Sequence, residues 1–299
     1  MKQPAPLKHG DLVTIISTAR KISKEEVAPA VKKLKDWGLR VRLGENLFAE
    51  HHQYAGTDEQ RAADFQAAAD DPEVKAVLCA RGGYGTVRII DKIDFSRFLN
   101  SPKWVIGYSD VTVLHSHIHG LGVETLHATM PVNFPADGNE NTALDSLRKA
   151  LFEGKVEYHL PPHKFNRKGR AEGLTTGGNL SILYSLLGSP SDIDTSGKIL
   201  FMEDLDEYLY HIDRMMMNMK RNGKFETPAG VIIGGMSDMN DNTIPFGKDA
   251  EEIISETLSD TGIPVAFGFP AGHIADNRAF FLGRKTKLEI TEKGVWFKQ

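Results

Sequence analysis

The first half of the chain alternates short apolar runs with amphipathic segments. Apolar runs rich in β-branched residues predict strands, and segments whose apolar positions recur every three or four residues predict helices. The pattern predicts strands at residues 11–17, 39–43, 74–79, 104–106 and 123–127, and helices at residues 24–37, 57–69, 86–93, 111–119 and 141–152. Strands that alternate with helices in this way are typical of a doubly wound parallel α/β sheet.

The pattern changes near residues 158–169, where prolines and charged residues replace any helical or strand period. We place a linker at residues 153–169, between a first domain of residues 1–152 and a second of residues 170–299. The second domain is predicted to be a smaller, mixed α/β unit with a smaller sheet. Its expected strands are residues 170–175, 198–202, 230–233 and 264–267 with a hairpin at 287–291 and 294–297, and its expected helices are residues 179–187 and 208–221.

Composition limits the class of protein. A chain of 299 residues is long enough for two domains, and 40% hydrophobic with 25% charged residues is ordinary for a soluble globular protein. A net charge of −4 argues against a nucleic-acid partner. No apolar run is long enough to cross a bilayer, and residues 1–6 lack a signal-peptide core, so we expect a cytoplasmic protein without a membrane partner. The only cysteine, Cys79, lies in an apolar run and is predicted to be a core residue.

Ser109 lies where a predicted strand turns into a predicted helix. Gly107 permits an unusual backbone angle just before it. Such a turn lifts a hydroxyl above the carboxyl edge of the sheet, where ligands bind, and makes Ser109 a candidate nucleophile. The alternative is a serine that only caps the following helix.

A serine nucleophile needs a base, and the base needs a carboxylate that orients it. His273 is the best-placed histidine because it lies in a glycine-containing loop after a strand, although an exposed loop histidine has no such role. Glu203 directly follows an apolar strand and is preferred as the acid. Its rivals are Asp204, Asp206 and Glu207.

The segment Arg81-Gly82-Gly83-Tyr84-Gly85 follows another strand and would present backbone amides at the same sheet edge. Such amides could stabilise an oxyanion. A phosphate-binding loop is the alternative, but the spacing fits neither a Rossmann fingerprint nor a P-loop.

Two other clusters suggest cofactor sites only weakly. His115 and His119 share a helix face, yet no glutamate follows His115 as a zincin helix would require, so packing and surface roles are preferred. The methionines of the helix at 208–221 are predicted to serve the core or a subunit contact. They are Met215, Met216, Met217 and Met219.

Five segments in chain order together resemble the LD-carboxypeptidases, a family of serine peptidases. They are Arg81-Gly82-Gly83-Tyr84-Gly85, Gly107-Tyr108-Ser109-Asp110, Gly177-Gly178-Asn179-Leu180-Ser181, Ile199-Leu200-Phe201-Met202-Glu203-Asp204 and Gly272-His273-Ile274-Ala275-Asp276-Asn277. The resemblance covers nearly the whole chain. It implies a flavodoxin-like N-terminal domain that carries the nucleophile, and a C-terminal domain that carries the acid and the base.

By this resemblance Ser109 is the nucleophile, Glu203 the acid and His273 the base, and the amides of Gly83 and Asp110 form the oxyanion hole. The family uses no metal or cofactor, is commonly dimeric, and is cytoplasmic where it recycles cell-wall peptides. Its typical reaction removes the terminal D-alanine from a murein tetrapeptide. The family also includes microcin C immunity peptidases, which cleave aminoacyl-nucleotide conjugates, and this is the alternative substrate class.

Three questions stay open. The carboxylate of the departing residue calls for a cation in the site. The candidates are Arg81, Arg88 and Arg278, and the sequence does not rank them. A ligand-binding module without catalysis predicts tight binding and no product. A metal-dependent hydrolase built on His115 and His119 predicts loss of activity in a chelator.

Overall fold

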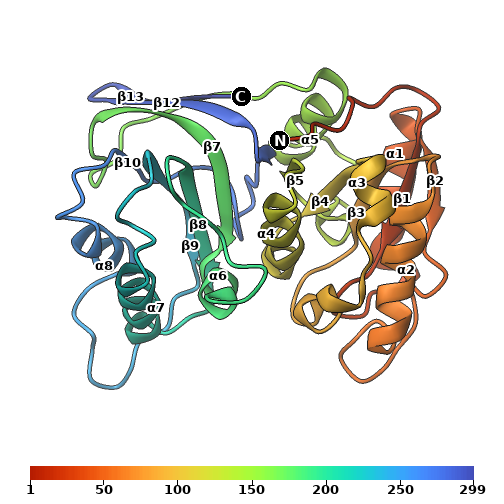
Figure 1. Cartoon of the computed structure of the whole chain (residues 1–299), viewed down its shortest axis with the longest axis horizontal. Helices are drawn as coiled ribbons and strands as arrows, with labels where there is room; N and C mark the ends of the chain where they lie inside the picture. The colour runs from red at the N-terminus through yellow and green to blue at the C-terminus, as the bar shows by residue number, and fades with distance from the viewer.

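Two β-sheets, each with its own helices, lie side by side in the computed structural model, which describes residues 1–299 (Figure 1). The first half of the chain contains β1 (Leu12–Ile16), α1 (Lys24–Asp36), β2 (Arg40–Leu43), α2 (Asp58–Asp70), β3 (Val74–Cys79), η1 (Thr86–Arg88), η2 (Ile90–Lys92), α3 (Ser96–Asn100), β4 (Trp104–Gly107), η3 (Ser109–Val111), α4 (Thr112–Gly120), β5 (Thr125–His127), η4 (Pro131–Asn133) and α5 (Thr142–Glu153). The second half contains β6 (Glu157–Leu160), β7 (Gly169–Asn179), α6 (Leu180–Leu186), β8 (Ile199–Leu205), α7 (Leu209–Arg221), β9 (Gly230–Ser237), α8 (Ala250–Thr257), β10 (Val265–Ala266), β11 (Phe280–Leu282), β12 (Lys285–Thr291) and β13 (Gly294–Lys298).

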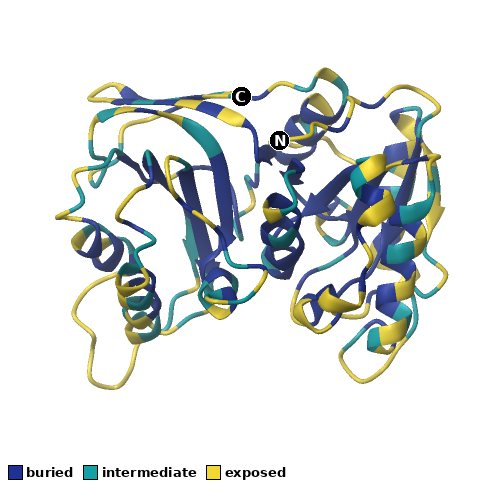
Figure 2. Cartoon of the chain, viewed as in Figure 1, coloured by how far each residue is buried: buried dark blue, intermediate teal, exposed yellow.

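The first sheet has the strand order β11-β5-β4-β3-β1-β2. Strands β1 to β5 are parallel, and their order β2-β1-β3-β4-β5 is that of a flavodoxin-like fold, which confirms the predicted architecture. The central strands are buried along nearly their whole length because helices cover both faces (Figure 2). Capping boxes at Ser23 and Thr57 start α1 and α2 where the sequence predicts helices.

The second sheet has seven strands in the order β10-β9-β8-β7-β12-β13-β6. Its first four strands are parallel and the others antiparallel, so the prediction of a mixed sheet is confirmed. The prediction that it would be the smaller sheet is wrong, because the first sheet has six strands. The predicted C-terminal hairpin is confirmed as β12 and β13.

One predicted helix is wrong, and two strands were not predicted. The helix expected at residues 86–93 is replaced by the short 3₁₀ turns η1 and η2. The chain enters η1 from Gly85 at φ 146°, and the amide of Thr86 donates to the Asp110 carboxylate. Strand β6 lies within the segment where the sequence predicts only a linker, and β11 has no counterpart among the predicted strands.

Strand β11 connects the two halves of the molecule. It pairs antiparallel with β5 of the first sheet, and the chain then continues directly into β12 of the second sheet. One hydrophobic cluster of 39 buried residues spans both sheets. Within it the rings of Phe201 on β8 and Phe280 on β11 lie 4.8 Å apart. Burial of each such ring stabilises the fold by about 2 kcal/mol, so separating the sheets would be costly.

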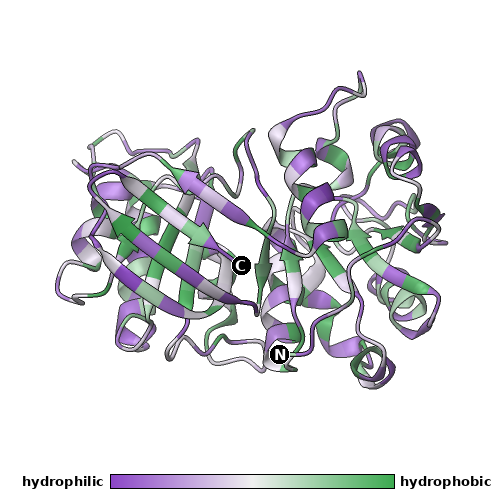
Figure 3. Cartoon of the chain, turned by 90° about the horizontal axis from the view of Figure 1, so that it is seen from above, coloured by the Kyte–Doolittle hydropathy of each residue, from purple (hydrophilic) through white to green (hydrophobic).

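The surface is mainly polar, in contrast to the apolar core. Seen from above, hydrophilic residues lie mainly on the outer faces of the helices, and hydrophilic and apolar residues alternate along outer strands of the second sheet such as β12 (Figure 3). No helix combines the length and the apolar composition needed to span a bilayer.

Candidate active site

Ser109 begins the 3₁₀ turn that joins β4 to α4, and α4 lies between the two sheets (Figure 1). Its backbone has φ 64°, a left-handed conformation that is uncommon for a serine and is typical of strained functional positions. Its side chain caps neither η3 nor α4. The alternative of a helix-capping serine is therefore wrong.

The hydroxyl of Ser109 lies 3.0 Å from Nε2 of His273. His273 lies in the loop that precedes β11, the strand that connects the two sheets. Its carbonyl accepts a hydrogen bond from the Ser237 hydroxyl at 2.8 Å, and the Tyr108 ring packs edge-on against the imidazole with centroids 4.9 Å apart. The imidazole is therefore held firmly, and the alternative of an exposed loop histidine is wrong because the side chain is only 13% exposed.

Glu203 is completely buried near the end of β8 and accepts two hydrogen bonds from His273. Nδ1 of the imidazole lies 2.7 Å from Oε2 of Glu203, and the backbone amide of His273 donates to the same oxygen at 3.0 Å. Because Nδ1 is hydrogen-bonded to the carboxylate, Nε2 is free to accept the proton of Ser109.

The rival carboxylates are bound elsewhere. Asp204 accepts from the Asn179 side chain and from the amide of Ser181, both at 2.9 Å. Burial and the neighbouring charge of Glu203 raise the pKa of Asp204 to about 7. Asp206 accepts from the side chain of Asn240, and Glu207 contacts His211. Only Glu203 contacts His273.

The electrostatic environment favours a charged imidazole. Burial alone would lower the pKa of His273, but the hydrogen bond and the charge of Glu203 outweigh burial, with a smaller contribution from Asp204. The pKa of His273 is therefore raised above its ordinary value. Nucleophilic catalysis by serine requires a base whose protonated form is stabilised, and the Glu203 carboxylate stabilises the protonated imidazole of His273 in this way.

The glycine-rich loop lies directly against Ser109. A Cβ atom placed on Gly82 would come within 2.9 Å of Ser109 Oγ and 3.5 Å of the backbone nitrogen of Asp110. The backbone amides of Gly83 and Asp110, the predicted oxyanion donors, have no hydrogen-bond acceptor within the protein. Two backbone amides without an acceptor, next to the Ser109 hydroxyl, can stabilise the negative charge that develops on a carbonyl oxygen under attack.

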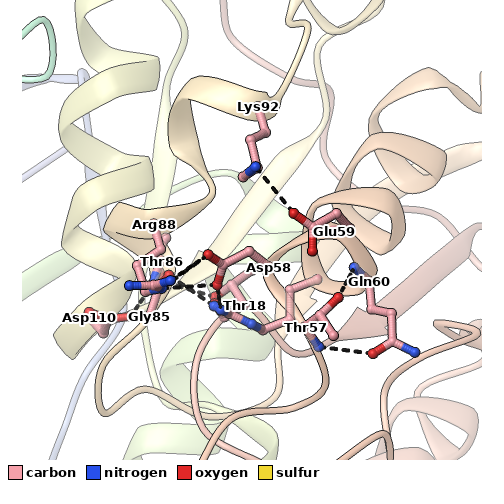
Figure 4. A network of polar contacts seen from close by, with 11 residues as sticks. Thr18, Thr57, Asp58, Glu59, Gln60, Gly85, Thr86, Arg88, Lys92 and Asp110 are labelled. Atoms are coloured by element: carbon pink, nitrogen blue, oxygen red, sulfur yellow. Dashed lines mark hydrogen bonds and ion pairs between the residues drawn. The ribbon is translucent and has the colours of Figure 1, made fainter. Parts of the chain in front are cut away.

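A network of buried hydrogen bonds and ion pairs supports the glycine-rich loop (Figure 4). The guanidinium of Arg61 is fully buried and donates to the carbonyls of Thr18 and Gly85 at 2.7 and 2.9 Å. It also pairs with Asp58, which in turn binds Arg88. The Asp110 carboxylate accepts from the Thr86 amide at 2.8 Å. The Gly85 carbonyl and the Thr86 amide, at the start of η1, are therefore both held by buried side chains.

A pocket of about 560 Å³ opens above Ser109 and His273. Polar and charged residues from both halves of the molecule line it, including the predicted Gly83, Asp110 and Arg81. Arg88 and Arg278 do not line it and pair with Asp58 and Asp276 instead. The sequence analysis missed Arg20, which lines the pocket but belongs to no recognisable motif.

The histidines of α4 have structural contacts. Both ring nitrogens of His115 are occupied, by the carbonyl of Gly107 at 2.9 Å and by the Thr125 hydroxyl at 2.8 Å. His117 contacts Ser191, and His119 is buried with His115. The pair at positions 115 and 119 therefore packs in the core, as preferred from the sequence. Met215, Met216 and Met219 are also buried in the core, and so is Cys79.

Comparison with known proteins identifies the family. The LD-carboxypeptidase N-terminal domain matches residues 13–128, and the LD-carboxypeptidase C-terminal domain matches residues 172–288. The chain belongs to the LD-carboxypeptidase family.

Individual members of the family align over nearly their whole length. A probable murein peptide carboxypeptidase of Bacillus subtilis is 38% identical, over 97% of this chain and 92% of its own. The crystal structure of muramoyltetrapeptide carboxypeptidase from Oxalobacter formigenes superimposes with a TM-score of 0.88 at 27% identity, over 96% of this chain and 98% of that one. The microcin C7 self-immunity protein of Escherichia coli is 25% identical, over 97% and 94% of the two chains.

Proposed function

We propose that this protein is a serine LD-carboxypeptidase that removes the terminal D-alanine from murein tetrapeptides during cell-wall recycling. The observation that carries the proposal is the continuous hydrogen-bonded chain from Ser109 through His273, which both line the pocket, to the buried Glu203. Two relatives with names that refer to murein peptides or muramoyltetrapeptide support the substrate class.

In the proposed mechanism His273 takes the proton of Ser109 as its oxygen attacks the carbonyl of the diamino acid. Glu203 stabilises the imidazolium, and the amides of Gly83 and Asp110 bind the oxyanion. His273 then protonates the departing amine of D-alanine. Water, activated by the same imidazole, hydrolyses the acyl-enzyme and frees Ser109.

The proposal also covers the cellular location, the oligomeric state and the domain division of the protein. Murein fragments that are recycled reach the cytoplasm, so we place the enzyme there, as a homodimer of two-domain chains. The proposed domains are residues 1–152 and 170–299, joined by residues 153–169, of which 157–160 add β6 to the edge of the second sheet. Size-exclusion chromatography with light scattering tests the dimer independently of activity.

The experiment that tests the function is a mass measurement of products. The protein is incubated with an LD-tetrapeptide, with the isomer that ends in L-alanine, and with an aminoacyl-nucleotide conjugate. Loss of one alanine from the LD-tetrapeptide alone is expected. Cleavage of the conjugate alone would favour an immunity-type peptidase, and tight binding of the tetrapeptide without any product would favour a binding module.

A further inference from the structure

The charges around the pocket are divided between its two walls. Apart from the buried carboxyls of Asp110 and Asp204, whose pKa values burial raises, the first half of the chain contributes the cations Arg20 and Arg81, and the segment just after β8 contributes Asp206 and Glu207. A substrate carboxylate would be repelled by the second wall and attracted by the first. The cation that receives the carboxylate of the departing residue should therefore come from the first wall.

Of the two cations on that wall, Arg20 is the one without a carboxylate partner. Arg81 is paired with Glu26 at 3.2 Å, whereas the guanidinium of Arg20 forms no ion pair within the protein. Arg20 is exposed, so its charge is available to a ligand in the pocket.

The stem of Arg20 lies across Gly83. A Cβ atom on Gly83 would lie 2.1 Å from Cδ and 2.5 Å from Cγ of Arg20, and Gly83 has φ 110°. The amide of Arg20 also approaches the carbonyl of Gly82 at 3.4 Å. The arginine is therefore packed on the loop whose Gly83 amide is the proposed oxyanion donor. Arg20 also lines the pocket.

Covalent geometry places a terminal carboxylate close to the same loop. In a peptide cut at its last bond, only the amide nitrogen and one α-carbon separate the scissile carbonyl from the terminal carboxylate. When the carbonyl oxygen occupies the oxyanion hole, the carboxylate lies within a few ångströms of it. An arginine whose stem lies on Gly83 and whose side chain lines the pocket can meet it with two parallel hydrogen bonds.

We propose that Arg20 binds the terminal carboxylate of the substrate and so makes the enzyme an exopeptidase. This inference rests on the proposed function and adds a specificity residue to it. Arg20 binds the leaving group and takes no part in proton transfer. Its loss should therefore remove the preference for a free carboxylate and leave the chemistry of Ser109 intact.

The test compares two substrates, the LD-tetrapeptide with a free terminal carboxylate and the same peptide ending in an amide. The wild-type enzyme is expected to prefer the free acid. Arg20→Ala is expected to lower the ratio of kcat/KM on the acid to kcat/KM on the amide by about 100-fold, as loss of a charged bidentate contact predicts. Arg20→Lys should keep part of the preference. Arg97→Ala is the matched control, because Arg97 is exposed and outside the pocket.

Each result has a defined meaning. Equal losses on both substrates, or an unchanged preference in Arg20→Ala, would overturn the role of Arg20 while the proposed function stands. Loss of the preference in Arg81→Ala but not in Arg20→Ala would transfer the role to Arg81. A wild-type enzyme that cleaves neither peptide would overturn the proposed function, and this inference with it.

Discussion

One carboxylate oxygen of Glu203 holds both the ring and the backbone of His273. Nδ1 lies 2.7 Å and the amide nitrogen 3.0 Å from the same Oε2 atom, inside a protein core where Glu203 is completely shielded from water. The two bonds fix the position of the loop and the orientation of the imidazole together. A buried carboxylate without these partners would be strongly destabilising, so the site and the local fold depend on each other.

Glu203→Gln tests this coupling through the pH dependence of the reaction. The carboxylate raises the pKa of His273, and catalysis needs the neutral imidazole, so kcat/KM of the wild type should fall as pH drops through that raised value. Removing the charge lowers the pKa of His273 and moves the acidic limb to lower pH, while kcat falls by about 10⁴-fold. An acidic limb that stays in place in the variant would contradict the assignment.

Gly82→Ala tests the packing of the glycine-rich loop against the nucleophile. The new Cβ would come within 2.9 Å of both Cβ and Oγ of Ser109, so the loop or the hydroxyl must shift. We expect kcat/KM to fall by about 100-fold, because a displacement of about 1 Å is enough for such a loss. The melting temperature checks that the fold persists. Full activity in the alanine variant would show that the loop does not constrain the site.

Arg61→Met tests the buried network behind the loop. The variant leaves the carbonyls of Thr18 and Gly85 without their donor and removes one partner of Asp58. We expect the free energy of unfolding to fall by about 3 kcal/mol. Urea denaturation measures it, with Arg97→Met on the surface as a control expected to change stability by less than about 0.5 kcal/mol. Equal stability of the two variants would show that the network is dispensable.

Chelation tests the alternative of a metal-dependent hydrolase. The proposed mechanism uses only side chains and backbone amides, and both ring nitrogens of His115 have protein partners. Prolonged dialysis against EDTA is therefore expected to leave kcat/KM on the LD-tetrapeptide unchanged. A loss that added zinc restores would favour the metal-dependent mechanism.

Local sequence patterns were sufficient where structure depends on local interactions. The central strands of the first sheet are apolar along their length, and Ser23 and Thr57 begin helices with capping boxes, so periodicity and caps identify them. Ser109, Glu203 and His273 were found because Ser109 closely follows β4, Glu203 lies near the carboxyl end of β8 and His273 lies in the loop after β10.

The parts that the sequence did not predict depend on distant partners. Strand β11 has three residues and forms only by pairing with β5, and β6 is defined by its pairing with β13. The turns η1 and η2 replace a helix because Asp110, far along the chain, binds the Thr86 amide. Arg20 carries no local motif, and only its tertiary contact with Gly83 places it at the pocket.

The most direct test of the central claim is the turnover of Ser109→Ala on the LD-tetrapeptide, with the melting temperature measured on the same sample. Ser109 makes its one side-chain hydrogen bond with His273, so the fold should survive its loss. The account predicts a fall in kcat of about 10⁶-fold with little change in melting temperature. Unchanged turnover by a folded Ser109→Ala protein would contradict it.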